Sequence, residues 1–315
     1  KKLPKKTHNV DKFVELKEQC QAFVQRYAQH KNVLCVIATT AREIDQPALE
    51  AWAAQSNVFL YSECSSSLSW SSAIERGGED ALKTVPKPEV IIAIGSRWIS
   101  EDVLQLFDAC QQLLLIHDFK QTQDYLKIAT LEAHATGLNI TEVLPQLTAN
   151  DAYVDQLKEH FSTSQSSSIC KDQPLTEVHC LKGIDTIIKQ SERLFLGNSL
   201  TVRLATRCMD TINPALKSVT QRGVSGIDGL VSSAYGLAYA SQKPTLAICG
   251  DLSMLYDTNG LLFLKQQPQP FVLIVLNNKG GRLFTRLPIK QEPICESLFV
   301  MPHNITIQQL TAAYG

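Results

Sequence analysis

The sequence predicts an α/β protein built from two Rossmann-like domains, each with a parallel β-sheet. Three observations support this prediction. Short, continuous apolar runs alternate with longer stretches of helical spacing, which is typical of parallel strands covered by helices on both faces. The chain has 315 residues, enough for two domains. A polar, serine-rich stretch at residues 162–168 separates two regions of this kind.

The first half of the chain carries the first alternating region. Apolar runs at residues 32–38, 58–61, 90–94 and 113–116 are predicted strands, and residues 47–55 and 101–111 have helical spacing. Gly95 follows a strand, but one glycine is not a dinucleotide-binding fingerprint, so we interpret it as a tight turn. We therefore expect a central Rossmann-like domain at residues 1–165.

The second half repeats the alternation after the serine-rich stretch. We expect a linker at residues 166–174 and a second domain at residues 175–315. Within that domain a helix is predicted to begin near Thr176. The predicted strands are residues 193–196, 245–249 and 271–276, and the predicted helices are residues 229–240 and 254–266.

Composition excludes several classes of protein. The 30 Lys and Arg residues balance 31 Asp and Glu, so no basic excess indicates binding to nucleic acid. No apolar run has the length of a membrane span. The nine cysteines form no Cys-x-x-Cys pair, which argues against a zinc ribbon or a disulfide framework. We expect a cytoplasmic protein with reduced thiols.

Chemistry-bearing residues follow two of the predicted strands in the second domain. Gly250-Asp251 ends one strand, and Asn277-Asn278 ends the next. Parallel strands bring both ends to one edge of the sheet, where open α/β sheets bind ligands. Carboxylate, amide and backbone oxygens suit Mg²⁺, which often takes its remaining ligands from phosphate and water.

Further features of this stretch favour an anion. Gly250 permits close approach of a phosphate, and a helix beginning near Ser253 would offer N–H groups to it. The alternative is that Asp251 caps the helix and that the asparagines and glycines form a turn. The coincidence of both halves on neighbouring strands favours a magnesium–diphosphate site.

These residues resemble the thiamine diphosphate-dependent enzymes, whose cofactor motif runs from Gly-Asp to Asn-Asn. Leu252 stands where most members have glycine. With that variant, residues 197–203, 222–229, 277–284 and 299–304 resemble the 2-succinyl-5-enolpyruvyl-6-hydroxy-3-cyclohexene-1-carboxylate synthase (MenD) family. The resemblance is specific over residues 197–304. Residues 1–160 match the family's central domain only in pattern.

The resemblance implies a reaction and a fold. The second domain would be the diphosphate-binding domain of the thiamine diphosphate-binding fold. The family decarboxylates 2-oxoglutarate on the cofactor and adds the succinyl unit to isochorismate, in menaquinone or phylloquinone biosynthesis. Members bury the cofactor between subunits, so a homodimer or homotetramer is implied.

Site residues follow from the same resemblance. Mg²⁺, or Mn²⁺ in its place, would be ligated by Asp251, Asn278 and the carbonyl of Gly280. The cofactor would also contact Gly250, Leu252, Ser253, Ser225 and Ile227, the last as an aliphatic wedge. The substrates would contact Ser199, Arg203, Arg222, Leu283 and Phe284. The arginine forks, which we place in loops at or near strand ends, suit the carboxylates of both substrates. Ordinary core packing is the alternative for Ile227, Leu283 and Phe284.

The chain departs from the family pattern at both ends. We find no N-terminal pyrimidine-binding domain with its activating glutamate, and the chain stops at Gly315 before the family's C-terminal end. We therefore expect no catalytic residue within this chain and no activity from the chain alone. The alternatives are another thiamine diphosphate enzyme, such as a 2-oxo acid decarboxylase or an acetolactate synthase, and a non-catalytic module of the same fold.

Overall fold

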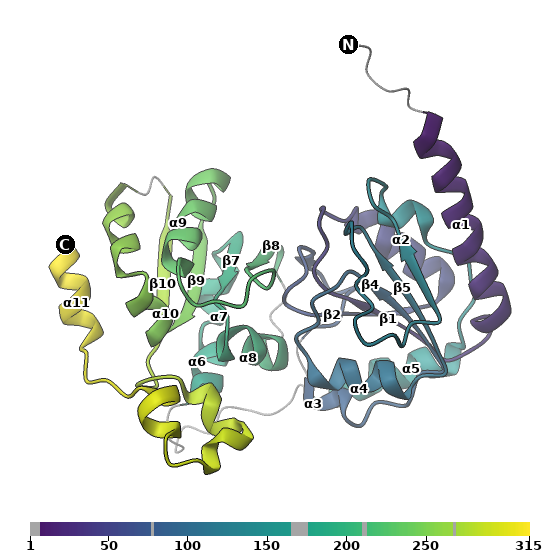
Figure 1. Cartoon of the computed structure of the whole chain (residues 1–315). Helices are drawn as coiled ribbons and strands as arrows, with labels where there is room; N and C mark the ends of the chain where they lie inside the picture. The colour runs from purple at the N-terminus through teal and green to yellow at the C-terminus, as the bar shows by residue number, and fades with distance from the viewer. Residues whose placement is uncertain (1–6, 77–78, 165–175, 210–212, 267–268) are drawn as a thin grey trace. The chain divides into compact units, whose positions relative to one another are not determined.

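The computed structural model describes residues 7–76, 79–164, 176–209, 213–266 and 269–315. The chain divides into two compact units, residues 1–168 and 169–315. Each unit is a parallel β-sheet with helices packed against it, as the sequence predicts (Figure 1). None of the helices in these ranges is both long enough and apolar enough to cross a membrane.

The first unit has a parallel sheet in the order β2-β1-β4-β5-β6. Its strands are β1 (Val33–Ile37), β2 (Phe59–Ser62), β4 (Val90–Ile94), β5 (Gln112–His117) and β6 (Leu131–His134), and a short β3 spans Ser69–Trp70. Its helices are α1 (Thr7–Tyr27), α2 (Gln46–Ser56), α3 (Glu79–Leu82), α4 (Glu101–Ala109), η1 (Ile140–Val143) and α5 (Asp151–Ser164).

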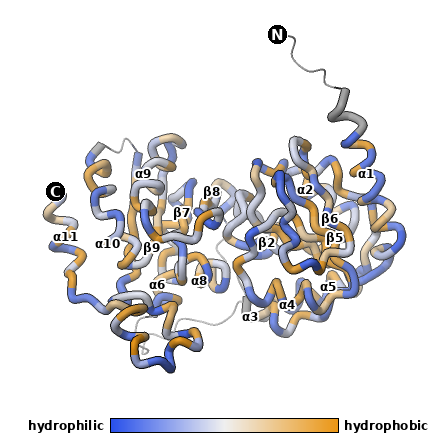
Figure 2. Tube along the Cα trace, viewed as in Figure 1, coloured by the Kyte–Doolittle hydropathy of each residue, from blue (hydrophilic) through white to orange (hydrophobic). Residues whose placement is uncertain are grey.

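Successive side chains along the strands of this unit point to opposite faces of the sheet, so the unit has two apolar cores. Val33 and Cys35 of β1 pack with residues of α1 and α2 on one face, whereas Leu34 and Val36 pack with α3, α4 and α5 on the other. This is why the strands are continuously apolar, and Figure 2 shows hydrophobic residues concentrated along them. Gly95 has φ 98°, and a Cβ there would meet the Thr39 carbonyl at 2.5 Å, so the predicted tight turn requires glycine.

The second unit places β10 (Phe271–Leu276), β9 (Thr245–Gly250), β7 (Arg193–Leu196) and β8 (Asn213–Thr220) side by side in that order, all parallel. Its helices are α6 (Glu177–Gly183), α7 (Asp185–Lys189), α8 (Leu200–Cys208), α9 (Leu230–Ser241), α10 (Asp251–Tyr256) and α11 (Ile307–Tyr314). Three 3₁₀ segments are η2 (Thr258–Gln266), η3 (Arg282–Arg286) and η4 (Pro288–Gln291), and η5 (Cys295–Val300) is a π-helix.

Two sequence predictions about elements are wrong in detail. The single helix predicted for residues 254–266 is instead α10 followed by the 3₁₀ segment η2. The break lies at Asp257, whose carboxylate accepts hydrogen bonds from N and Oγ of Ser232 at 2.6 and 2.9 Å. That contact with α9 overrides the helical periodicity. The serine-rich stretch, predicted to separate the two regions from residue 162 on, begins instead within α5, which includes residues 162–164, while the linker predicted at 166–174 lies outside the described residues.

Candidate functional site

A pocket of about 370 Å³ lies at the carboxyl edge of the second sheet. Its walls come from the segments that follow β7, β8, β9 and β10. This is the edge at which open α/β sheets bind ligands. Every residue that the sequence analysis assigned to a site lines this pocket: Ser199, Arg203, Arg222, Ser225, Ile227, Gly250, Asp251, Leu252, Ser253, Asn278, Gly280, Leu283 and Phe284.

Asp251 is the buried acid of the pocket, only 2 % exposed. Its Oδ1 accepts the Leu252 N–H at 2.8 Å. Its Oδ2 accepts the Gly280 N–H at 2.8 Å and lies 3.1 Å from Nε2 of His303. A carboxylate has about four acceptor positions, so these contacts fix its orientation and leave one position for a further partner.

Asn278 lies beside Asp251 because β10 and β9 pair in register, with Leu276 opposite Gly250. Its Nδ2 donates to Oε1 of Glu177 at 2.8 Å. Its Oδ1 is buried and has no hydrogen-bond partner among the described residues. Buried polar atoms are rarely left unpaired, so this oxygen calls for a ligand.

Two glycines shape the same corner of the pocket. Gly280 has φ 128°, and a Cβ there would collide with the carbonyl of Val300, so only glycine fits. Its carbonyl accepts the Arg282 N–H at 2.9 Å, which leaves one lone pair for another partner. A Cβ at Gly250 would meet nothing within 4 Å, so the pocket has open space beside this residue.

The helix after Asp251 differs from the prediction. α10 begins at Asp251 rather than near Ser253, has six residues, and has no side-chain cap at Gly250. The N–H of Leu252 already bonds to Asp251. The N-terminus of this helix therefore offers an anion fewer donors than the sequence suggested.

The two arginines reach the pocket from different elements. Arg222 follows β8 in a loop, as predicted. Arg203, also predicted in a loop, instead lies in the first turns of α8, and its guanidinium donates to the Ser199 carbonyl at 2.8 Å. Ser199 has φ 71°, a conformation that costs free energy in non-glycine residues and gathers at functional sites.

The remaining predicted residues form the apolar part of the wall. Ile227 is partly buried and packs against the cluster of Phe195, Leu230, Ala234 and Ala247 while it lines the pocket. Leu283 and Phe284 of η3 are likewise only partly buried, and the Phe284 ring lies 5.3 Å from that of Phe299. Ile227 and Phe284 therefore both pack against neighbouring side chains and line the pocket, and Leu283 lines it beside them.

Sequence reasoning missed three residues of this site. Asn198 lies two positions after the end of β7, and its Nδ2 donates to the carbonyls of Val224 and Gly226 at 2.9 and 2.6 Å, which holds the loop after β8. Its place after a strand could have revealed it. Glu177 and His303 lie far along the chain from Asn278 and Asp251, and no spacing rule connects them.

A comparison with models of known protein families gives no match for this chain. The fit of the site to a magnesium–diphosphate group therefore depends on its own geometry. The unpartnered Oδ1 of Asn278, the remaining acceptor position of Asp251 and the open space at Gly250 together suit Mg²⁺, which prefers oxygen ligands and often takes some of them from phosphate and water.

Proposed function

We propose that the second unit holds Mg²⁺ and thiamine diphosphate, in a cytoplasmic enzyme of the 2-succinyl-5-enolpyruvyl-6-hydroxy-3-cyclohexene-1-carboxylate synthase type. The observation that carries the proposal is the buried Asn278 Oδ1 without a partner beside the oriented carboxylate of Asp251. The resemblance of residues 197–304 supplies the identity of the cofactor and the substrates.

The cation would be held by Asp251, Asn278 and the Gly280 carbonyl, with Mn²⁺ able to replace Mg²⁺. When bound, thiamine diphosphate supplies the electron sink for decarboxylation of 2-oxoglutarate and transfer of its succinyl unit to isochorismate. Gly250, Leu252, Ser253 and Ser225 would position the cofactor, and Ile227 would support it from the apolar side.

Substrate recognition would depend on other residues that line the same pocket. Three arginines line the pocket: Arg203, Arg222 and Arg282. Arg282 pairs with Glu296 at 3.1 Å. We therefore assign the substrate carboxylates to Arg203 and Arg222, with Ser199, Leu283 and Phe284 beside them. Guanidinium forks bind carboxylates through two parallel hydrogen bonds. Two dicarboxylic substrates suit such a wall better than pyruvate does.

Calorimetric titration of the chain with Mg²⁺ and thiamine diphosphate tests the proposal. Asp251→Ala and Asn278→Ala should each weaken Mg²⁺-dependent binding by roughly 100-fold or more, because changes even outside the ligand shell cost 10–100-fold. Asn259→Ala is the matched control, since Asn259 is exposed and lies outside the pocket. It should bind within about two-fold of the wild type, as expected for a surface substitution.

Three results would contradict the proposal. Binding that survives Asp251→Ala unchanged would show that the ligand assignment is wrong. Absence of Mg²⁺-dependent cofactor binding in the wild-type chain would favour a non-catalytic module of this fold. In the intact protein, turnover of pyruvate but not of 2-oxoglutarate would favour a different thiamine diphosphate enzyme.

A further inference from the structure

The first unit contains a cluster of two histidines and one glutamate that the proposed function does not use. His117 is the last residue of β5 and His134 the last residue of β6, and these two residues are register partners in the parallel sheet. Glu132 lies two residues before His134, so its side chain is on the same face of β6. The strand register therefore brings all three side chains together.

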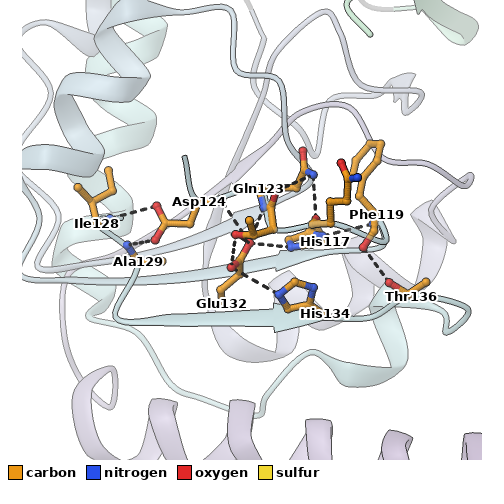
Figure 3. A network of polar contacts seen from close by, with 11 residues as sticks. His117, Phe119, Gln123, Asp124, Ile128, Ala129, Glu132, His134 and Thr136 are labelled. Carbon is orange, nitrogen blue, oxygen red and sulfur yellow. Dashed lines mark hydrogen bonds and ion pairs between the residues drawn. The ribbon is translucent and has the colours of Figure 1, made fainter. Parts of the chain in front are cut away.

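The three side chains converge closely (Figure 3). The Nε2 atom of His117 lies 2.9 Å from Oε1 of Glu132, and Nε2 of His134 lies 3.4 Å from Oε2 of the same carboxylate. One ligand atom from each residue falls within 4.8 Å of the others. With metal–ligand bonds of about 2.0–2.1 Å, neighbouring ligands of a tetrahedral Zn²⁺ lie roughly 3.3 Å apart. Small movements of these side chains would therefore complete such a set.

A shell of hydrogen bonds holds the carboxylate in place. Thr122 Oγ1 donates to both oxygens of Glu132 at 2.9 and 2.7 Å, and the N–H groups of Gln123 and Asp124 donate to Oε1 at 2.5 and 3.1 Å. Outer-shell contacts of this kind orient metal-ligating carboxylates. The cluster is thus built around a fixed anion rather than around mobile surface acids.

The protonation states agree with ligation. Partial burial raises the pKa of Glu132, but hydrogen bonds from Thr122, Gln123, Asp124 and His117 outweigh burial and lower that pKa to about 2. Burial lowers the pKa of His117. At neutral pH the site therefore offers a carboxylate and a neutral imidazole, the forms that bind metals.

The exposure of the side chains gives an ion access from one side. The side chain of His117 is fully buried, that of Glu132 is 18 % exposed and that of His134 is 38 % exposed. Two imidazoles and one carboxylate with open positions match first-row transition metals, whereas Mg²⁺ prefers oxygen ligands alone. We propose that His117, Glu132 and His134 form a binding site for a divalent transition metal, with Zn²⁺ as the best match and water completing the shell.

Two contacts of His117 must change when the metal binds, because the metal replaces the hydrogen bond between its Nε2 and Oε1 of Glu132, and its Nδ1 then loses the Phe119 N–H. The Phe119 N–H donates to Nδ1 of His117 at 3.3 Å, which places the ring proton on Nε2 in the metal-free protein. A metal on Nε2 moves that proton to Nδ1, so the Phe119 amide must turn away. Metal binding should therefore change the environment of the Phe119 amide. The bound metal would also link β5 to the edge strand β6.

Titration of the full chain with Co²⁺ as a spectroscopic probe, and then with Zn²⁺, tests this site. Excess Mg²⁺ in the buffer keeps the oxygen-rich pocket of the second unit from taking the probe. We expect one equivalent to bind, with visible bands of four-coordinate Co²⁺, without the near-ultraviolet bands of cysteine ligation. The amide resonance of Phe119 should shift in step with the titration.

Three variants make the test decisive. His134→Ala and Glu132→Gln should each weaken binding by roughly 100-fold or more, because changes in the outer shell alone cost 10–100-fold. His134 is the partly exposed member, so its variant should fold, and circular dichroism checks this. His30→Asn is the control, since His30 is exposed, lies outside the cluster, and has a left-handed backbone that asparagine tolerates. Binding as tight in folded His134→Ala as in the wild type, or no binding in the wild type, would overturn the proposal and leave the cluster as a hydrogen-bonded network.

Discussion

At the scale of single residues, the contact between Glu177 and Asn278 decides which amide atom remains for a ligand. Glu177 accepts from Nδ2 of Asn278, so the oxygen, and not the nitrogen, is left without a partner among the described residues. A cation needs that orientation. Glu177 is thus a positioning residue that acts through Asn278, although it lies about a hundred positions earlier in the chain.

We predict that Glu177→Ala weakens Mg²⁺ binding in the presence of thiamine diphosphate by roughly ten-fold, the lower range for loss of an outer-shell partner. Glu177→Gln retains an acceptor for the Asn278 amide and should restore binding to within about three-fold, because a neutral acceptor keeps much of the hydrogen bond. Magnesium titration by calorimetry measures both. A Gln variant as weak as the Ala variant would indicate that the charge of Glu177, and not its contact, matters.

Individual site residues differ in how far the sequence could predict them. Asp251 directly follows β9 and Asn278 lies two positions after β10, so the parallel sheet alone brings them to one edge. Glu177, His303 and the His117–Glu132–His134 cluster depend on side-chain approach between segments. Strand register could have indicated His117 and His134. However, β6 has only four residues, and its sequence Leu-Glu-Ala-His is not the continuous apolar run that predicted the other strands.

At the scale of elements, the turn after β10 is the most constrained segment of the pocket. Its Gly280 combines a positive φ, a donor to Asp251, and a close approach to Val300 of η5. Any side chain would push η5 away and displace the N–H that orients Asp251. The two glycines after Lys279 therefore serve the backbone geometry of this turn.

We expect Gly280→Ala to destabilise the protein by about 1–3 kcal/mol or more, because it adds backbone strain to a steric collision. Gly236→Ala is the matched control. Gly236 is exposed in the interior of α9, has no positive φ, and leaves open space for a Cβ. That change should stabilise the protein by up to ~1 kcal/mol through helix propensity.

Urea unfolding followed by circular dichroism compares the two glycine variants. Opposite signs are the expected result. Equal stability of Gly280→Ala and wild type would mean that η5 moves freely, which would remove the close approach as the reason for glycine at this position.

Elements also show where sequence reasoning fails. The apolar strands β1, β4 and β9 were predictable because burial on both faces leaves a continuous apolar run. The edge strand β10 is less buried, but its sequence is also a continuous apolar run. The end of the helix predicted for residues 254–266 was not predictable, since its break depends on Asp257 bonding to Ser232 of α9. Periodicity records which face is apolar but does not record a tertiary hydrogen bond that interrupts the helix.

At the scale of the whole molecule, each unit has its own sheet and its own apolar core. Cys35 lies in the core of the first unit and Cys249 in that of the second, and they are 0 % and 2 % exposed. Burial raises the pKa of both thiols. For Cys249 the charges of Asp251 and Asp257 add to the effect of burial, and its pKa reaches about 12. Neither thiol can react in the native state, because reaction requires both access and the thiolate.

The alkylation rate of each cysteine therefore reports the opening of its own unit. Cys249 is the second-last residue of β9, the strand that leads into Asp251, so any opening that exposes it also disrupts the proposed cation site. A ligand that binds only the closed state suppresses such opening by the factor 1 + [L]/Kd, roughly 100-fold when its concentration is 100 times Kd. We predict that Mg²⁺ with thiamine diphosphate slows alkylation of Cys249 at pH 8 by that factor, measured by peptide mass spectrometry, and that Asp251→Ala abolishes the protection.

Cys35 in the same sample separates a ligand effect on the second unit from a general loss of reagent activity. Unchanged alkylation of Cys249 under conditions where calorimetry detects bound cofactor would mean that the cofactor binds away from the edge formed by β9 and β10.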